Sequence, residues 1–220
     1  MIKVAIMVDG GFYLKRARKI WGEKTPEERA NELFNYCLKH THIDGEDIYL
    51  YRIFYYDCPP ADKEIYHPLL NKTIQLNKSN TYNWCTEFHN HLKKKRKTAL
   101  RMGMLSDVQT QYTLKPETVK KLCTKKITID DLTENDFELE IGQKGVDMKI
   151  GLDISSLAYK KLVDQIVLIS GDSDFVPAAK HARREGIDFI LDPMYASVKP
   201  ELYEHIDGLR SFAKNHNQND

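Results

Sequence analysis

The sequence predicts an α/β fold in which a central, mainly parallel sheet is covered by helices on both faces. Strand-like segments, rich in β-branched and aromatic residues, alternate along the chain with segments whose apolar residues recur at helical spacing. Residues 166–169 are almost wholly apolar, which is typical of a parallel strand covered on both sides. Together, the alternation and this buried strand indicate strand–helix–strand units that build one sheet.

The first part of the chain has clear boundaries. A β-compatible run ends at Asp9-Gly10-Gly11, a tight turn that leads into a basic helical segment. A second strand-like run is stopped by Pro59 and Pro60. The expected elements are a strand over residues 2–8, helices over 12–20 and 27–39, and a strand over 47–56.

Clear signals return at Gly145. The apolar residues that follow keep helical spacing as far as Val163, and this length favours a helix because strands average about 5 to 6 residues. The Asp-Ser-Asp sequence at 172–174 supplies a cap for the next helix, which Gly186 closes. The expected elements are a helix over 146–163, a strand over 166–169, a helix over 175–185, a strand over 187–191 and a helix over 200–207.

The middle of the chain is harder to interpret. Within residues 61–142 we expect a helix over 87–95 and a strand over 98–105. A chain of 220 residues accommodates one large domain, at roughly 150 residues per domain. We therefore expect a single domain over residues 1–214, with an elaboration around 61–142 and a disordered tail over 215–220.

The length of the apolar runs and the spacing of the cysteines indicate the cellular compartment and whether the chain contacts a membrane. No apolar run approaches the roughly 20 residues of a membrane span, and Asp9 interrupts the first run too early for a signal peptide. The 4 cysteines lie far apart without a CxxC pair, which argues against a disulfide framework. These features predict a cytosolic protein with reduced thiols and no membrane partner.

Basic residues cluster although the whole chain is balanced, with 33 basic and 32 acidic residues. Such clusters bind phosphates locally, and the run at 93–97 has aromatic residues nearby that are suited to base stacking. A solvated helix face explains the same pattern, so both interpretations stay open. The candidate substrate-binding residues are Lys15, Arg16, Lys93, Lys94, Lys95, Arg96, Lys97, Lys144 and Lys149.

Four aspartates are placed where parallel sheets bind ligands. Asp9 and Asp172 each follow a strand, Asp174 lies two residues further on, and Asp147 starts the helix that leads into the Asp172 strand. Each alone is equally explained as a cap. Converging carboxylates, however, repel one another and are usually held together by a cation. Oxygen ligands suit Mg²⁺ or Mn²⁺, which activate water and stabilise charge on a phosphodiester.

Two further aspartates have less defined roles. Asp57 also ends a strand, but the neighbouring prolines make a turn role at least as plausible. Asp153 lies about 240° around the helix from Asp147, so it is either exposed or one layer behind the site.

Four motifs carry a resemblance to a known family. They span nearly the whole chain, and the last two, with their spacing, are the more specific. The motifs are Val8-Asp9-Gly10-Gly11, Tyr55-Tyr56-Asp57-Cys58-Pro59-Pro60, Gln143-Lys144-Gly145-Val146-Asp147 and Ser170-Gly171-Asp172-Ser173-Asp174-Phe175-Val176-Pro177.

On these motifs the chain resembles the NYN family, specifically the LabA-like (DUF88) branch of the PIN-like ribonucleases. The resemblance implies a PIN-like α/β/α sandwich and metal-dependent cleavage of RNA, with the acidic positions matched by Asp9, Asp147, Asp172 and Asp174. One departure is Phe12, because many relatives have asparagine there, a polar group suited to substrate or metal-bound water. The segment between the second and third motifs gives no basis for transferring substrate choice.

The preferred interpretation is a metal-dependent endoribonuclease with Mg²⁺ or Mn²⁺ as cofactor and single-stranded RNA as partner. The four aspartates are expected to hold the cation and the lysines to neutralise phosphate charge. A DNA nuclease or a phosphatase is a second enzymatic interpretation, since carboxylates alone do not sense the 2′-hydroxyl. A catalytically silent RNA-binding or protein-interaction regulator on the same fold is the alternative of a different class, which Phe12 keeps open.

Overall fold

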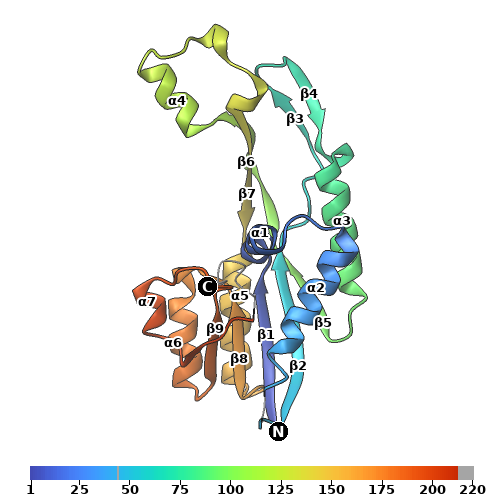
Figure 1. Ribbon diagram of the computed structural model, residues 1–220, viewed down its shortest axis with the longest axis vertical. Coiled ribbons are helices and arrows are strands. Elements are labelled where there is room, and N and C mark those ends of the chain that lie inside the picture. Colours follow the sequence, from blue (N-terminus) through green and yellow to red (C-terminus); the bar gives the residue numbers. More distant parts are fainter. Residues whose placement is uncertain (44, 213–220) are drawn as a thin grey trace, which may run out of the picture. The chain divides into compact units, whose positions relative to one another are not determined.

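The computed structural model describes residues 1–43 and 45–212, without the side chains of residues 107–109. The chain folds into two compact units (Figure 1). The first, called the sheet unit below, contains Met1–Asp57, Glu87–Gly103 and the described residues from Gly145 on. The second, called the hairpin unit, contains Cys58–Thr86 and Met104–Lys144.

The sheet unit is built on six parallel strands in the order β10-β9-β8-β1-β2-β5. The central strand β1 buries its residues Val4 to Val8 completely, as expected of a strand covered on both faces. This sheet confirms the predicted α/β class. The strands are β1 (Ile2–Asp9), β2 (Ile48–Asp57), β5 (Thr98–Met102), β8 (Gln165–Ile169), β9 (Asp188–Asp192) and β10 (Gly208–Leu209).

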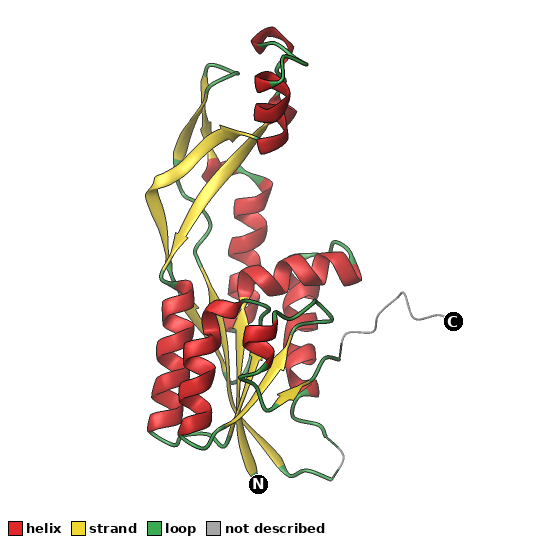
Figure 2. Ribbon diagram, turned by 90° about the vertical axis from the view of Figure 1, so that its left-hand side faces the viewer, coloured by secondary structure: helices red, strands yellow, loops and turns green. Residues whose placement is uncertain are grey.

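Helices cover both faces of this sheet, giving the three layers of an α/β/α fold (Figure 2). Tyr55 of β2 contacts Phe88 and His89 of α3, whereas the next residue, Tyr56, donates a hydrogen bond to Asp153 of α5. Because successive side chains of a strand point to opposite faces, α3 and α5 lie on opposite sides. The helices are α1 (Gly10–Trp21), α2 (Pro26–Lys39), α3 (Asn80–Lys93), α5 (Val146–Tyr159), α6 (Val176–Arg184) and α7 (Pro200–Tyr203).

Local sequence explains the ends of several helices. Thr25 and Glu28 form a reciprocal capping box at the start of α2, with Pro26 in the first turn. Helix α5 ends before the expected Val163 because Lys161 adopts a left-handed backbone, with φ 49°. No helix in the described part of the chain combines the length and apolarity that crossing a bilayer requires.

The last helix is shorter than expected. It was predicted over 200–207 but ends at Tyr203. The carboxylate of Asp207 instead accepts hydrogen bonds from the Phe189 backbone N–H and the Arg183 guanidinium, which leads the chain into β10. The predicted tail over 215–220 lies outside the described residues.

The hairpin unit consists of two antiparallel strand pairs and one helix. His67 of β3 is buried beside the rings of Tyr112 and Phe137. The strand expected over 98–105 is divided at Gly103, since β5 joins the parallel sheet and β6 pairs with β7. The elements are β3 (Glu64–His67), β4 (Lys72–Gln75), η1 (Leu76–Lys78), β6 (Met104–Leu114), α4 (Pro116–Cys123), η2 (Ile129–Asp131), η3 (Glu134–Asp136) and β7 (Phe137–Lys144).

Candidate active site

The candidate site lies at the carboxyl edge of the parallel sheet, where the strand order reverses. From β1 the chain builds outward through β2 and β5, and it then returns to the other side of β1 with β8. Val8 of β1 is paired with Ile169 of β8, so Asp9 and the Ser170–Asp174 turn follow neighbouring strand ends. Ligands of open α/β sheets bind at such a switch point.

Asp9 is held in place by its own backbone turn and by β8. One carboxylate oxygen accepts a hydrogen bond from the Phe12 N–H at 3.1 Å, which caps α1, and the other accepts from the Ser170 hydroxyl at 3.1 Å. Asp9 therefore caps α1, as its position after a strand predicted. Its second oxygen is directed at the end of the neighbouring strand β8. The cap and the proposed ligand role are compatible.

Gly10 lets α1 start directly against β2. A Cβ atom at this position would lie 2.5 Å from the Tyr55 hydroxyl oxygen and 2.6 Å from the Tyr56 carbonyl oxygen. We expect Gly10→Ala to destabilise the fold by about 1–3 kcal/mol, because buried side chain and backbone must both shift. Urea unfolding measures this, with Gly11→Ala as the matched control, since its Cβ would meet nothing closer than Asp9 Oδ1 at 3.7 Å. Equal stabilities of the two variants would contradict the close approach.

Asp172 and Asp174 lie on the short turn η4 (Ser173–Phe175) that follows β8. The Asp172 carboxylate accepts a hydrogen bond from the Asp174 N–H at 3.0 Å, and the Asp172 N–H donates to the Ser170 hydroxyl at 3.3 Å. Both aspartates are exposed. Ser170 thus contacts Asp9 and the backbone of Asp172 at once, and it ties the two strand ends together.

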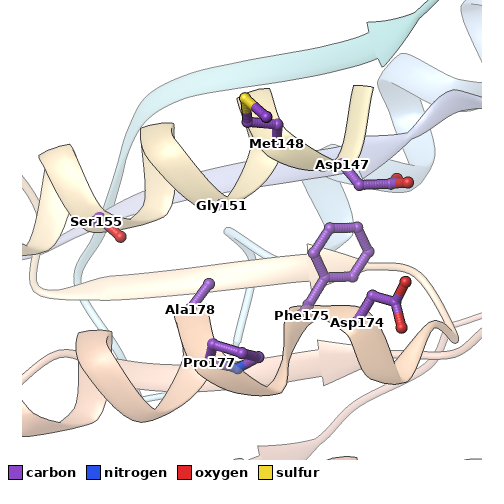
Figure 3. Close-up of a pocket in the computed structure, with 8 residues that line it drawn as sticks. All are labelled: Asp147, Met148, Gly151, Ser155, Asp174, Phe175, Pro177 and Ala178. Atoms are coloured by element: carbon purple, nitrogen blue, oxygen red, sulfur yellow. The ribbon is translucent and has the colours of Figure 1, made fainter. Parts of the chain in front are cut away.

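Asp147 reaches the same edge from the first turn of α5. It lines a groove of about 350 Å³ between α5 and α6, together with Asp174 and Phe175 (Figure 3). Figure 3 shows the two carboxylates at the same end of this groove, each at the start of its helical segment. A helix N-terminus favours a negative charge, but burial and the neighbouring carboxylates outweigh this effect at Asp147 and raise its pKa.

The four carboxylates act on one another electrostatically. Burial raises the pKa of Asp9, and the charges of Asp147 and Asp172 raise it further. Burial also raises the pKa of Asp147, as do the charges of Asp172 and Asp174. The structure therefore brings all four predicted aspartates into one interacting group.

This group is open and does not form a closed metal cage. In the described part of the chain, no three Asp, Glu, His or Cys side chains are close enough together to hold a metal ion. The donor chemistry nevertheless suits a hard divalent cation, because all four groups are carboxylates that repel one another.

The raised pKa of Asp147 leads to a stability prediction. Above its ordinary value of about 3.9, the unfolded chain releases this proton first, so the folded protein loses stability as the pH rises through the higher folded-state pKa. We expect Asp147→Asn to stabilise the metal-free protein at pH 7 by about 0.5 kcal/mol, the scale of a surface substitution. The gain should vanish below pH 3.9.

Thermal melts of both proteins in EDTA across this pH range provide the measurement. Asp130→Asn is a suitable control because Asp130 is exposed and lies in the hairpin unit. A lower melting temperature of Asp147→Asn at pH 7 would mean that this carboxylate is stabilising and not repelled.

The basic residues that were predicted to bind substrate differ in their exposure and in whether they already hold another part of the chain. Arg16 donates from Nε and Nη2 to the Met194 carbonyl oxygen at 3.2 and 2.5 Å, so it holds a loop. Lys15 is exposed on α1, and Lys149 is half-buried in the first turn of α5. Lys144 is exposed at the end of β7, in the hairpin unit.

The basic run at 93–97 lies at the opposite edge of the sheet. It joins the end of α3 to the start of β5, whereas the aspartates follow the carboxyl ends of β1 and β8. Lys95 donates to the Asn31 side chain, and Lys97 donates to the Leu50 carbonyl and covers the Tyr49 ring at 3.6 Å. The structure does not bring this run together with the carboxylates, and a contact with RNA there stays a prediction.

Sequence reasoning missed the role of Ser170 and left the roles of Asp57 and Asp153 open, and the structure gives all three defined partners. Ser170 carries no signal beyond its place before the Gly-Asp motif. Asp57 is more than a turn residue, because its carboxylate accepts hydrogen bonds from the Tyr55 hydroxyl at 2.9 Å and from His89 at 3.2 Å. Asp153 is paired bidentately with Arg101, at 2.7 and 2.8 Å.

Phe12, the departure from the family pattern, covers Gly171. A Cβ on Gly171 would lie 2.8 Å from the Phe12 ring, so ring and glycine are in close contact beside Asp172. The aromatic residue thus contributes an apolar surface next to Gly171 and Asp172.

A parallel α/β/α sheet with carboxylates gathered at its switch point is the arrangement of a PIN-like nuclease domain. Residues 40–199 match the model of the NYN domain. The chain therefore belongs to this family of PIN-like domains. The match includes Asp147, Asp172 and Asp174 and begins after Asp9. No curated protein sequence matches the chain significantly.

Solved structures add information on the fold alone. A crystal structure of a protein of unknown function from Vibrio parahaemolyticus is similar with a TM-score of 0.51 and 14% identity, over 97% of this chain and 94% of that one. The maltogenic α-amylase AmyB from Thermotoga neapolitana is matched with a TM-score of only 0.23 and 10% identity, over 94% of this chain and 48% of its own.

Proposed function

We propose that the protein is a metal-dependent endoribonuclease of the LabA-like branch of the NYN family. The observation that carries the proposal is the group of four carboxylates at the switch point, where burial raises the pKa values of Asp9 and Asp147 and the neighbouring carboxylate charges raise them further. Such repulsion is relieved by a bound cation, and NYN domains belong to the PIN-like nucleases. The cofactor proposed is Mg²⁺ or Mn²⁺ because all four donors are carboxylates.

In this mechanism Asp9, Asp147, Asp172 and Asp174 would hold the cation. A bound divalent ion would lower the pKa of water and neutralise charge on the scissile phosphate. The Phe12 N–H and the Ser170 hydroxyl orient the two oxygens of Asp9, and the Asp174 N–H orients Asp172. These hydrogen bonds align the carboxylates before substrate binds. The site therefore needs less reorganisation during the reaction.

The proposed substrate is single-stranded RNA. The proposed compartment is the cytosol. An open groove with exposed aspartates admits a flexible strand, and Lys15 on α1 and Lys149 on α5 lie on helices that begin at this edge. A catalytically silent RNA-binding regulator is the second candidate. It is favoured by the absence of a closed three-ligand metal group among the described residues and by the apolar Phe12.

The test is cleavage by the purified full chain of three labelled substrates of equal length: single-stranded RNA, duplex RNA and single-stranded DNA. Each is incubated with Mg²⁺, with Mn²⁺ and with EDTA, and Asp172→Asn is included to exclude a contaminating nuclease. We expect cleavage of single-stranded RNA that requires the metal and the Asp172 carboxylate. RNA binding without turnover under all conditions supports the silent regulator, and equal cleavage of DNA contradicts RNA selectivity.

A further inference from the structure

The loop between β9 and α7, residues 193–199, has an unusual backbone beside the carboxylates. Met194 and Tyr195 are consecutive residues in the left-handed region, with φ values of 47° and 57°. Non-glycine residues rarely adopt this conformation, and it persists only where the surrounding structure imposes it.

Several contacts hold this conformation. The Arg16 guanidinium donates two hydrogen bonds to the Met194 carbonyl, and the Met194 N–H donates to the buried Asp192 carboxylate at 2.8 Å. The Tyr195 hydroxyl donates to the Ser211 carbonyl at 3.2 Å. The loop is therefore set by three separate parts of the chain, namely α1, β9 and the segment after β10.

The result of this anchoring is an exposed aromatic ring in a fixed place. Tyr195 remains 49% exposed although its hydroxyl and its neighbour's backbone are engaged. A buried ring would explain the strained backbone by packing, but this ring is not buried. The ring is therefore accessible to a ligand.

The same loop places a cation next to the carboxylates. Lys199, which is exposed, donates from Nζ to the hydroxyl of Ser173 at 3.1 Å. Ser173 lies between Asp172 and Asp174 in the chain. An exposed ring and a cation on one loop are the two components of single-strand binding, a stacking platform and a phosphate contact.

We propose that loop 193–199 is the substrate-binding wall of the site, with Tyr195 stacking on a base and Lys199 contacting a phosphate of the same strand. The proposal rests on the proposed function in one respect, since it takes single-stranded RNA as the ligand. The wall adds a substrate-binding cation that is independent of the basic run at 93–97, which lies at the other edge of the sheet.

The experiment measures binding of a fluorescently labelled single-stranded RNA oligonucleotide to the full chain in EDTA, where turnover is absent. Tyr195→Asn removes the ring but tolerates the left-handed backbone, and Tyr195→Phe keeps the ring without the hydroxyl. We expect Tyr195→Asn to weaken binding about tenfold and Tyr195→Phe to stay within about twofold. Lys199→Ala should reduce the slope of log affinity against log salt by about 0.7.

Matched controls lie at the far end of α5. Tyr159 is 73% exposed and Lys160 is also exposed, and α5 runs from the site toward the opposite edge of the sheet. Tyr159→Ala and Lys160→Ala should leave both the affinity and the salt slope unchanged. Melting temperatures of all variants show whether the loop variants stay folded, and if Tyr195→Asn does not fold, Lys199→Ala decides, because Lys199 has an ordinary backbone with φ −68°.

The outcomes separate the two proposals. Unchanged affinity of both Tyr195→Asn and Lys199→Ala overturns the binding wall, even if the wild-type protein cleaves RNA. Equal losses in the Tyr159 and Lys160 controls also overturn it. Wild-type protein that binds RNA through Tyr195 and Lys199 but never cleaves it supports the wall and contradicts the nuclease. A wild-type protein without RNA affinity contradicts both.

Discussion

Asp172→Asn is expected to lower RNA cleavage by about 10²–10³-fold while leaving RNA affinity within a few-fold of the wild type. The substitution removes one full negative charge from the proposed cation site. The amide oxygen still accepts the Asp174 N–H, so the turn η4 is preserved. Affinity persists because contacts between basic side chains and phosphates supply most of the binding free energy.

Single-turnover cleavage in Mg²⁺ and RNA binding in EDTA measure the two effects separately. Asp188→Asn is the matched control, because Asp188 is an exposed aspartate at the amino end of β9, at the other edge of the sheet. The control should retain full activity. Wild-type rates for Asp172→Asn in protein free of contaminating nuclease would exclude Asp172 from the catalytic site.

Asp192→Ala is expected to destabilise the fold by about 3–5 kcal/mol, the largest stability effect that we predict. Asp192 and His40 are both 0% exposed, and the Asp192 carboxylate accepts hydrogen bonds from Tyr36 at 2.6 Å and His40 at 2.9 Å. It also accepts from Ser211 at 2.5 Å and from the Met194 N–H at 2.8 Å. Alanine removes the acceptor of three buried donors, namely the Tyr36 hydroxyl, His40 and the Met194 N–H.

The groups around Asp192 are shielded from water as well. Burial raises the pKa of Tyr36 and of Cys37 well above their ordinary ranges, and the negative charge of Asp192 raises both further. A shift of about 2–4 °C per kcal/mol predicts a melting temperature lower by about 6–20 °C. Calorimetry measures this, with Asp188→Asn again as control. A decrease below about 2 °C would show that water replaces the carboxylate.

Local patterns in the sequence predicted most of the sheet unit. The apolar run before Asp9 and the run at 166–169 became β1 and β8, with one added residue at Asp9 and at Gln165. These predictions succeeded because a strand buried on both faces has to be apolar throughout. Asp9, Asp172 and Asp174 were predicted to lie together for a related reason, since residues that follow parallel strands meet at one edge, and Asp147 was added because its helix leads into β8.

The hairpin unit was not predicted in detail for a physical reason. Strand β6 pairs with β7 across more than twenty residues that include α4 and two short helical turns. Such pairing depends on contacts between distant segments and leaves little trace in local periodicity. The division at Gly103, which ends β5 and starts β6, follows from the same pairing.

By itself the sequence determined the alternation of strands and helices, the capped helix starts and the placement of aspartates after strands, because these depend on neighbours within a few residues. The tertiary structure decided the rest. It placed the 93–97 run at the opposite edge from the carboxylates, engaged Arg16 with Met194 and imposed left-handed backbones on Met194 and Tyr195. These features depend on which distant segments pack together, and only the folded chain brings those segments into contact.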